Sequence, residues 1–320
     1  MDLFFVLSGY LITSRLIALK EQPNALKKFY INRTLRILPV YYLTLIIFYI
    51  GFNLLVKKQN FYLFEFYNHT WWSFLFFLQN WSFIFYNGFK ENFLGHFWSL
   101  AVEEQFYLIW PFFLYLFFGR GNFHQLIFTA ILLIIATRIL LYIKYPEWSD
   151  YEHYYYNTFC RMDSFLIGGI LFISKSNSNG RSFIKYYLAA LLIVIFGIYL
   201  TGSASFANPF ISTIGYTLIG LISAGLVDAA VSNSNKLLSA VFNGEWLKFT
   251  GKISYGLYIF HWLVLKTCKI KISNSLVNSF HINIAYADMI SLFSCLAISF
   301  IISIISYFYF ETWFLKRKFH

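Results

Sequence analysis

The sequence predicts an all-α fold: a polytopic transmembrane helical bundle with about nine crossings and one interfacial or re-entrant segment. Three observations support this prediction. Hydrophobic residues make up 59% of the 320 residues and charged residues only 12%, whereas an ordinary globular domain has about 25% charged residues. Apolar runs of roughly the length that spans a bilayer recur along the chain. The 40 phenylalanines and 25 tyrosines suit extensive membrane–water interfaces.

Nine apolar runs are candidates for membrane crossings. Together they predict a single membrane-embedded domain over residues 1–320. They lie at 2–19, 37–56, 98–118, 125–144, 159–174, 184–201, 209–230, 252–268 and 286–310. A tenth apolar stretch, 71–86, is interrupted by Gln79, Asn80 and Trp81. We expect this stretch to lie along the membrane surface or to re-enter the membrane on one side.

The basic residues decide between nine and ten crossings, because cytoplasmic loops are enriched in lysine and arginine. The connection over residues 20–36 is basic and is predicted to be cytoplasmic. If 71–86 does not cross, the basic loop at 175–185 and the C-terminal run 316–318 fall on the cytoplasmic side, together with the connection over residues 20–36. A crossing would place them outside. Nine crossings are therefore favoured, with the three lysines in 266–271 as the exception.

The net charge and the cysteine positions limit which binding partners and metal sites the sequence predicts. The formal net charge is +11, but no basic stripe with interleaved aromatic residues lies outside the apolar runs, so no nucleic-acid partner is predicted. Anionic membrane lipids are the expected partner of the basic loops. The cysteines lack metal-ligand spacing, so neither a metal site nor a disulfide framework is indicated; they are Cys160, Cys268 and Cys295.

Ionisable side chains in apolar runs are candidates for function, because each costs about 2.5–3.5 kcal/mol at the centre of a span. His96 and Glu103 are seven positions apart, so both lie on one face if the helix has begun at His96. An imidazole and a carboxylate in that arrangement can share a proton or orient a hydroxyl. They could also simply neutralise each other at a helix entrance. Trp98, Ser99 and Glu104 belong to the same run.

In two further groups, arginine residues lie at the start of a predicted helix. Arg33 and Arg36 share one face at the cytoplasmic start of a span, which suits a phosphate clamp; ordinary lipid-headgroup anchoring is the alternative. Arg161 and Asp163 open another helix, and the glycine pair at 168–169 would allow close helix packing. A role in a site and a structural ion pair both remain open for this group.

The last group is Ser254, Tyr258 and His261, which are spaced four and three positions apart on one helical face. A histidine this deep in an apolar run needs a polar partner, either a neighbouring helix or a substrate. Taken together, the four groups suggest a polar cavity through a helical bundle. Cationic groups would lie on its inner side and a His/Glu pair on its outer side.

The segments that contain these four groups, taken in their order along the chain, closely resemble the acyltransferase 3 family of bacterial membrane proteins. The run Trp98–Leu108, W-S-L-A-V-E-E-Q-F-Y-L, is the most specific match. The other matching segments are 2–12, the arginine-rich entry to Pro39, 161–169, 251–261 and the terminal pair Phe310-Glu311. The resemblance therefore spans essentially the whole chain.

The resemblance implies an enzyme that moves an acyl group, commonly acetyl, from acyl-coenzyme A (acetyl-CoA) to a hydroxyl of a glycan or glycolipid acceptor. Typical acceptors in the family are lipopolysaccharide O-antigen, peptidoglycan and exopolysaccharide. The implied location is the bacterial inner membrane, as a multi-pass protein. No metal is implied for the reaction.

The resemblance also assigns roles. The arginine pair would hold the donor from the cytoplasmic side, and His96 and Glu103 would lie near the outer, acceptor end. The candidate catalytic residues are His96, Glu103, Glu104 and His261. The candidate substrate-binding residues are Arg33, Arg36, Trp98, Ser99, Arg161, Asp163, Ser254 and Tyr258.

At its N-terminus the chain departs from the family pattern. Family members have an earlier helix that carries an arginine and the histidine regarded as the catalytic base, and no residue here takes that role by position. The predicted topology also places Met1 outside, which indicates a missing first helix. A start codon chosen too late is the favoured expectation, and a truncated, inactive relative is the alternative.

Two hypotheses from other functional classes are alternatives to the enzyme hypothesis. A transporter or flippase would explain a polar cavity without chemistry, although the repeated halves with matching broken helices that mark many transporters are absent. A non-catalytic scaffold in polysaccharide assembly is the other. Acetyl transfer from coenzyme A would separate the enzyme from both.

Overall fold

The chain is predominantly helical over the described residues of this computed structural model, which are 1–55, 61–86, 92–145, 152–177, 184–205, 208–232 and 240–318. No strand occurs in these ranges, which confirms the all-α prediction. The longer helices are α1 (Asp2–Leu19), α2 (Ala25–Leu55), α3 (Phe61–Leu75), α5 (Trp98–Phe117), α6 (Phe123–Lys144), α8 (Met162–Asn177), α9 (Ile184–Thr201), α10 (Tyr216–Ser232), α12 (Glu245–Phe280) and α13 (Ile284–Ser306). The shorter elements are α4 (Gln79–Phe85), η1 (Gly95–Phe97), α7 (Glu152–Tyr155), η3 (Thr158–Cys160), α14 (Thr312–Leu315) and two π-helical turns, η4 (Ile211–Gly215) and η5 (Tyr307–Glu311).

Six helical segments of the described chain are long and apolar enough to cross a membrane. They are Asp2–Leu19, Ala25–Gly51, Phe123–Lys144, Ile184–Thr201, Ile211–Ser232 and Ile284–Leu315. Each corresponds to one of the nine predicted runs. The other three runs, at 98–118, 159–174 and 252–268, are helical as α5, α8 and α12, but they are shorter or more polar. The number of crossings therefore stays a prediction.

Two helices extend well beyond the apolar runs that predicted them. Helix α2 begins at Ala25, so the basic residues of 27–36 lie in the helix and not in a connection before it. Helix α12 continues to Phe280, so the lysines in 266–271 lie on a helix and not in a loop. Hydropathy marks only the apolar part of a helix, whereas long basic side chains let it continue into the polar region.

The stretch 71–86 is broken in the structure. Helix α3 ends at Leu75 and α4 begins at Gln79, with Phe77 between them in the left-handed region (φ 55°). A bulky residue with positive φ is uncommon and interrupts helical hydrogen bonding. Neither half is long enough to span a bilayer, which agrees with an interfacial or re-entrant segment. Most of the basic loop at 175–185, namely residues 178–183, lies outside the described residues.

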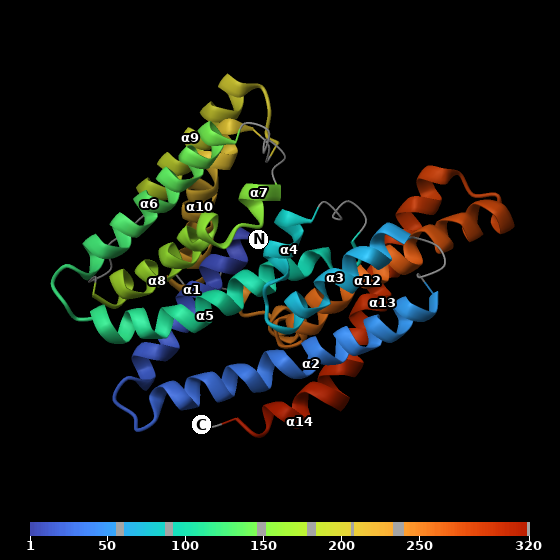
Figure 1. Cartoon of the computed structure of the whole chain (residues 1–320), viewed down its shortest axis with the longest axis horizontal. Coiled ribbons are helices and arrows are strands. Elements are labelled where there is room, and N and C mark those ends of the chain that lie inside the picture. Colours follow the sequence, from blue (N-terminus) through green and yellow to red (C-terminus); the bar gives the residue numbers. More distant parts are fainter. Residues whose placement is uncertain are drawn as a thin grey trace. The chain divides into compact units, whose positions relative to one another are not determined.

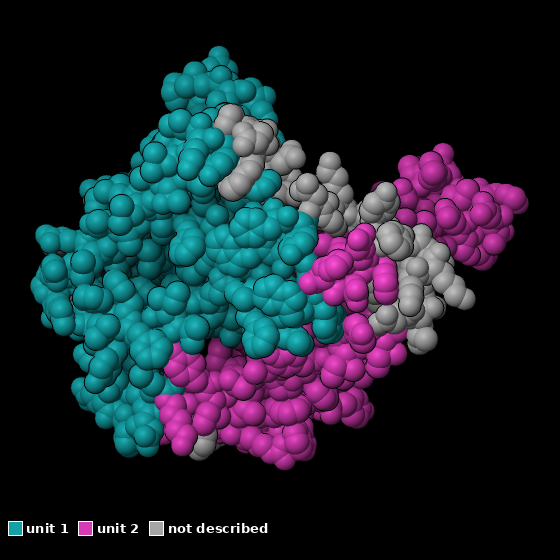
Figure 2. All heavy atoms as spheres, in the orientation of Figure 1, with its two compact units in different colours: residues 1–26, 70–87, 98–239 teal, residues 27–69, 88–97, 240–320 magenta. Residues whose placement is uncertain are grey.

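The chain divides into two compact units, which Figure 2 colours separately. Unit 1 comprises residues 1–26, 70–87 and 98–239, and unit 2 comprises residues 27–69, 88–97 and 240–320.

In unit 1, helix α1 packs directly against α8 and α10 (Figure 1). Glycines permit this close approach. A Cβ added at Gly9 would lie 2.1 Å from the Phe165 carbonyl oxygen, and one added at Gly168 would lie 2.0 Å from the Val6 carbonyl oxygen. The predicted packing role of Gly168 is thus confirmed. Small residues at such contacts are the usual means of bringing membrane helices together.

In unit 2, α12 and α13 form a long antiparallel hairpin (Figure 1). His281 ends α12 in the left-handed conformation (φ 52°), and the Asn283 side chain caps the start of α13 by accepting from the Ala285 N–H. Ser273 donates to the Asp288 carboxylate at 2.8 Å near the tip of the hairpin. This pairing places α12 and α13 in a fixed register over several turns.

Candidate functional site

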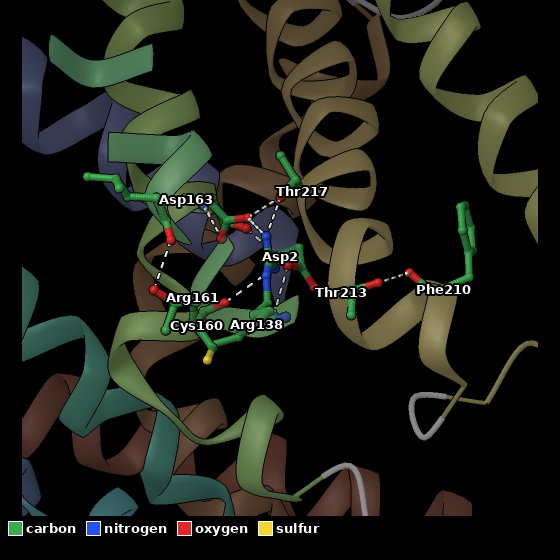
Figure 3. Close-up of polar contacts among 11 residues, drawn as sticks. Asp2, Arg138, Cys160, Arg161, Asp163, Phe210, Thr213 and Thr217 are labelled. Carbon is green, nitrogen blue, oxygen red and sulfur yellow. Dashed lines mark hydrogen bonds and ion pairs between the residues drawn. The ribbon is translucent and has the colours of Figure 1, made fainter. Parts of the chain in front are cut away.

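Two buried ion pairs lie side by side in unit 1 (Figure 3). Nη2 of Arg161 donates to the Asp2 carboxylate at 2.8 Å, and the Ser164 hydroxyl donates to the same oxygen at 3.0 Å. Nη2 of Arg138 donates to the Asp163 carboxylate at 2.8 Å. Arg161 and Asp163, predicted as one group, therefore each have a different partner, supplied by α1 and α6.

The guanidinium of Arg161 is enclosed by aromatic rings. Its Cζ atom lies 4.3 Å from the Tyr216 ring centroid and 5.0 Å from that of Tyr155. The side chain is fully buried, and its Nε and Nη1 atoms have no hydrogen-bond partner among the described residues. Burying an arginine requires a paired carboxylate, and Asp2 supplies it.

A second polar group in unit 1 is centred on Glu103. The Ser8 hydroxyl donates to the Glu103 carboxylate at 2.6 Å, and the Tyr107 hydroxyl donates to Ser8 at 3.2 Å. Glu103 is buried and Glu104, one position on, is half-buried. A hydroxyl that donates to a carboxylate fixes the orientation of its oxygens, so Glu103 is held in one position from α1.

The remaining predicted residues of this run are buried in unit 1. The Trp98 ring lies 4.6 Å from the Tyr155 ring and 5.8 Å from the Phe5 ring, centroid to centroid. Ser99 is fully buried at the start of α5. Trp98 thus belongs to the aromatic layer that also contains the rings around Arg161.

A closed ring of hydrogen bonds fixes α4 to α5. The Asn80 amide donates to Thr158 at 2.9 Å, Thr158 donates to the Gln105 carbonyl oxygen at 2.6 Å, and the Gln105 amide donates to Asn80 at 3.1 Å. Gln105 also donates to the Phe77 carbonyl at 2.7 Å. Asn80, one of the polar residues that interrupt the apolar stretch 71–86, is therefore used in packing.

Unit 2 contains a pair of histidines. The rings of His96 and His261 lie 5.2 Å apart, centroid to centroid, and the Tyr258 ring lies 5.5 Å from His96. The Tyr258 hydroxyl donates to the His96 carbonyl at 2.5 Å. Ser254 does not join this cluster, because it is exposed and its hydroxyl donates to the Gly251 carbonyl of its own helix.

The backbone contacts of these histidines define their tautomers. Nδ1 of His261 lies 3.0 Å from the Leu257 carbonyl and 2.8 Å from the Tyr258 carbonyl. A carbonyl only accepts, so the hydrogen-bond network assigns the proton to Nδ1. The neutral His261 ring then carries its lone pair on Nε2, where it can accept a proton from a hydroxyl.

His96 has the opposite tautomer. Its Nε2 lies 3.1 Å from the Ile259 carbonyl, so Nε2 carries the proton. His96 precedes the predicted span that begins at Trp98, and burial, reinforced by the nearby His261, lowers the pKa of His96 to about 3. His96 is therefore neutral near neutral pH.

The predicted arginine pair lies on α2 in unit 2. Arg33 is half-buried and Arg36 is exposed, and their spacing of three residues places them on one face of the helix. An exposed guanidinium beside a half-buried one can present a fork of donors to phosphate oxygens. The predicted pair His96 and Glu103, in contrast, falls in different units, so their interaction stays a prediction.

Sequence reasoning missed the partners Asp2, Arg138 and Ser8. Arg138 carried a usable signal, because it is a lone charge in the middle of the 22-residue helix α6. Asp2 and Ser8 lie within the segment that matched the family, but no spacing rule connects them to residues about a hundred or more positions away.

A family profile described as an acyltransferase domain matches residues 1–308. A peptidoglycan O-acetyltransferase of Listeria monocytogenes is 29% identical over 282 residues, which cover 82% of this chain and 44% of that protein. A Bacillus subtilis protein named as a candidate peptidoglycan O-acetyltransferase is 31% identical over 286 residues, covering 82% of this chain and 43% of that protein.

A candidate O-acetyltransferase of Staphylococcus aureus is 29% identical over 334 residues, covering 99% of this chain and 52% of that protein. The chain thus spans about half the length of the curated relatives it matches. None of the solved structures compared with the chain matches it.

Proposed function

The chain belongs to the acyltransferase 3 family, and on that premise we propose that it transfers an acetyl group from coenzyme A to a hydroxyl of a cell-wall glycan. Peptidoglycan is the proposed acceptor, because two of the relatives are named for it. Those names give lipopolysaccharide no support. The helices long and apolar enough to cross a membrane suit a multi-pass protein of the bacterial inner membrane.

The two contacts of His261 Nδ1 with backbone carbonyls, which leave Nε2 as the acceptor, are the observation that carries the proposal. His261 is half-buried, and two backbone carbonyls hold its Nδ1–H. The two carbonyls correspond to the group that orients other histidine bases. In those bases a fixed Nδ1–H leaves Nε2 to take the proton. His261 is the proposed general base.

The proposed reaction needs no group beyond the two substrates. Nε2 of His261 removes the proton of the sugar hydroxyl as its oxygen attacks the thioester carbonyl carbon. The tetrahedral intermediate collapses with cleavage of the carbon–sulfur bond, and the coenzyme A thiolate leaves and takes up the proton from His261. The products are an acetyl ester on the glycan and free coenzyme A.

The other candidate residues have proposed supporting roles. Arg33 and Arg36 would hold the phosphates of the donor, since guanidinium groups bind phosphate in a fork geometry. Glu103, oriented by Ser8, and the adjacent Glu104 are proposed for the acceptor end, as the family resemblance implies. Neutral His96 would donate or accept hydrogen bonds beside the base.

The test uses the purified chain in proteoliposomes with acetyl-CoA labelled on its acetyl group and soluble peptidoglycan fragments. Base-labile label should appear in the glycan and should require the protein. No label in the glycan, together with altered glycan export in a deletion strain, would favour a transporter or flippase. No label with unchanged export would favour the inactive scaffold.

A further inference from the structure

Glu311 is the one charged residue between Asp288 and Lys316, and it lies at the end of the longest apolar segment. Its side chain is only 5% exposed. The four preceding residues of the turn, 307–310, are aromatic and half-buried or exposed, so the turn buries its carboxylate and not its rings. A buried carboxylate in such a segment is costly unless it has a partner or a function.

Glu311 closes a π-helical turn, η5. Such turns are rare, less favourable than α-helix, and frequent at functional sites because the extra residue re-aims a side chain. The Ser306 hydroxyl, at the start of this turn, donates to Oε1 of Glu311 at 3.0 Å. The wide turn and this hydrogen bond together set the direction of the carboxylate.

Helix α12 contacts this carboxylate, and α2 in turn contacts α12 at the next residue along. A Cβ added at Gly256 of α12 would lie 3.2 Å from Oε1 of Glu311, so α12 passes directly over the carboxylate. The adjacent Tyr255 donates through its hydroxyl to the carbonyl of Ile37 on α2 at 2.9 Å. Arg36 is the residue before Ile37, so it lies on the part of α2 that contacts α12 next to Glu311.

We propose that Glu311 is a positioning residue that orients the Arg36 guanidinium toward the phosphates of the acyl donor. This inference rests on the proposed function, because Arg36 is there assigned to the donor. Arg36 is exposed, and a long exposed side chain samples many rotamers. A fixed carboxylate near the Arg36 side chain would select the rotamers that point to the donor. This would reduce the entropy lost on donor binding.

A purely neutralising role for Glu311 predicts an effect of opposite sign. If the carboxylate only cancelled the charge of Arg36, its removal would strengthen the attraction for an anionic donor. If the carboxylate orients Arg36, its removal should weaken donor binding. The sign of the change in donor affinity therefore separates the two roles.

The test compares the full chain with its Glu311→Gln variant, which keeps the size and the Ser306 contact but not the charge. We expect the KM for acetyl-CoA to rise about tenfold with little change in kcat, the signature of lost binding. The matched control is Glu245→Gln, which removes the same charge from an exposed position on α12. An unchanged or lowered KM for acetyl-CoA in Glu311→Gln would overturn the proposal.

A double-mutant cycle links Glu311 to Arg36. In an Arg36→Ala background, Glu311→Gln should raise the KM no further, because the group that it orients is gone. Equal effects in both backgrounds would contradict the positioning role. Thermal unfolding of each variant shows whether any loss is one of folding.

Calorimetric binding of coenzyme A itself separates this inference from the proposed function. If the wild-type chain binds coenzyme A but transfers no acetyl group, the proposed reaction fails, and the Kd of Glu311→Gln still decides the role of Glu311. If the wild type does not bind coenzyme A, both fail.

Discussion

The Asp2 carboxylate accepts a hydrogen bond from Nη2 of Arg161 at 2.8 Å, although the two residues are 159 positions apart. Both side chains are buried. The pair ties the start of α1 to the start of α8, beside the second buried pair of Arg138 and Asp163. Every carboxylate and guanidinium in this cluster therefore has an oppositely charged neighbour.

Removing one partner of this pair should destabilise the protein strongly. Asp2→Ala leaves the Arg161 guanidinium buried without its carboxylate, and we expect a loss of about 3–5 kcal/mol in the free energy of unfolding. The double variant Asp2→Ala/Arg161→Met should be less destabilised than Asp2→Ala alone. Thermal unfolding in detergent measures both, and Arg120→Met, at an exposed position, should have little effect. A double variant less stable than Asp2→Ala would argue against this prediction.

The contact between α1 and α8 should tolerate no side chain at its glycines. In Gly168→Ala the new Cβ would lie 2.0 Å from the Val6 carbonyl oxygen, so the helices must separate, at a cost of about 1–3 kcal/mol. Gly51→Ala is the matched control, because a Cβ there has no atom within 4 Å. That variant should be neutral or slightly stabilised. Equal unfolding temperatures for both variants would contradict the packing described here.

Glu103 should be needed for turnover, with Ser8 as its support. Glu103→Gln should lower kcat about 10²–10⁴-fold if the carboxylate takes part in proton transfer. Ser8→Ala should lower it about tenfold, since the hydroxyl only orients the carboxylate. Glu65→Gln, at an exposed position on α3, is the control. Wild-type acetylation by Glu103→Gln would remove Glu103 from the proposed mechanism.

Arg33 should contribute to donor binding through its fork of donors. Arg33→Lys keeps the charge but loses the planar geometry, so we expect the KM for acetyl-CoA to rise about tenfold. Lys27→Ala removes a charge from an exposed position of the same helix and should change the KM little. If Arg33→Lys leaves the KM unchanged while Lys27→Ala raises it, only the net charge of α2 matters.

Hydropathy predicted the helices that are uniformly apolar and misjudged those with polar ends. The run predicted at 184–201 coincides with α9, Ile184–Thr201, because a polar stretch that ends at Ser182 precedes it and Gly202-Ser203 follow it. The run predicted to start at residue 37 lies inside α2, which begins at Ala25. Helical hydrogen bonds continue through basic residues, which hydropathy counts as a boundary.

The site residues were predictable by type, but their partners were not. The rule that a charge in an apolar run needs a partner selected Arg161 and Asp163, and the structure supplies a partner for each. Those partners, Asp2 and Arg138, come from other helices. Helix packing brings them together, and sequence spacing along a single helix contains no information about it. The His96–His261 contact across 165 positions is another case of this kind.

The most direct test of the account is the turnover number of His261→Asn in the labelled acetyl-CoA assay. Asparagine can reproduce the Nδ1–H donor that contacts the Leu257 and Tyr258 carbonyls, but it has no counterpart of the Nε2 lone pair. His281→Asn is the control, because asparagine tolerates the left-handed backbone there. We predict that kcat falls about 10²–10⁴-fold in His261→Asn and is unchanged in His281→Asn. Wild-type kcat in a folded His261→Asn variant would contradict the proposal that His261 is the base.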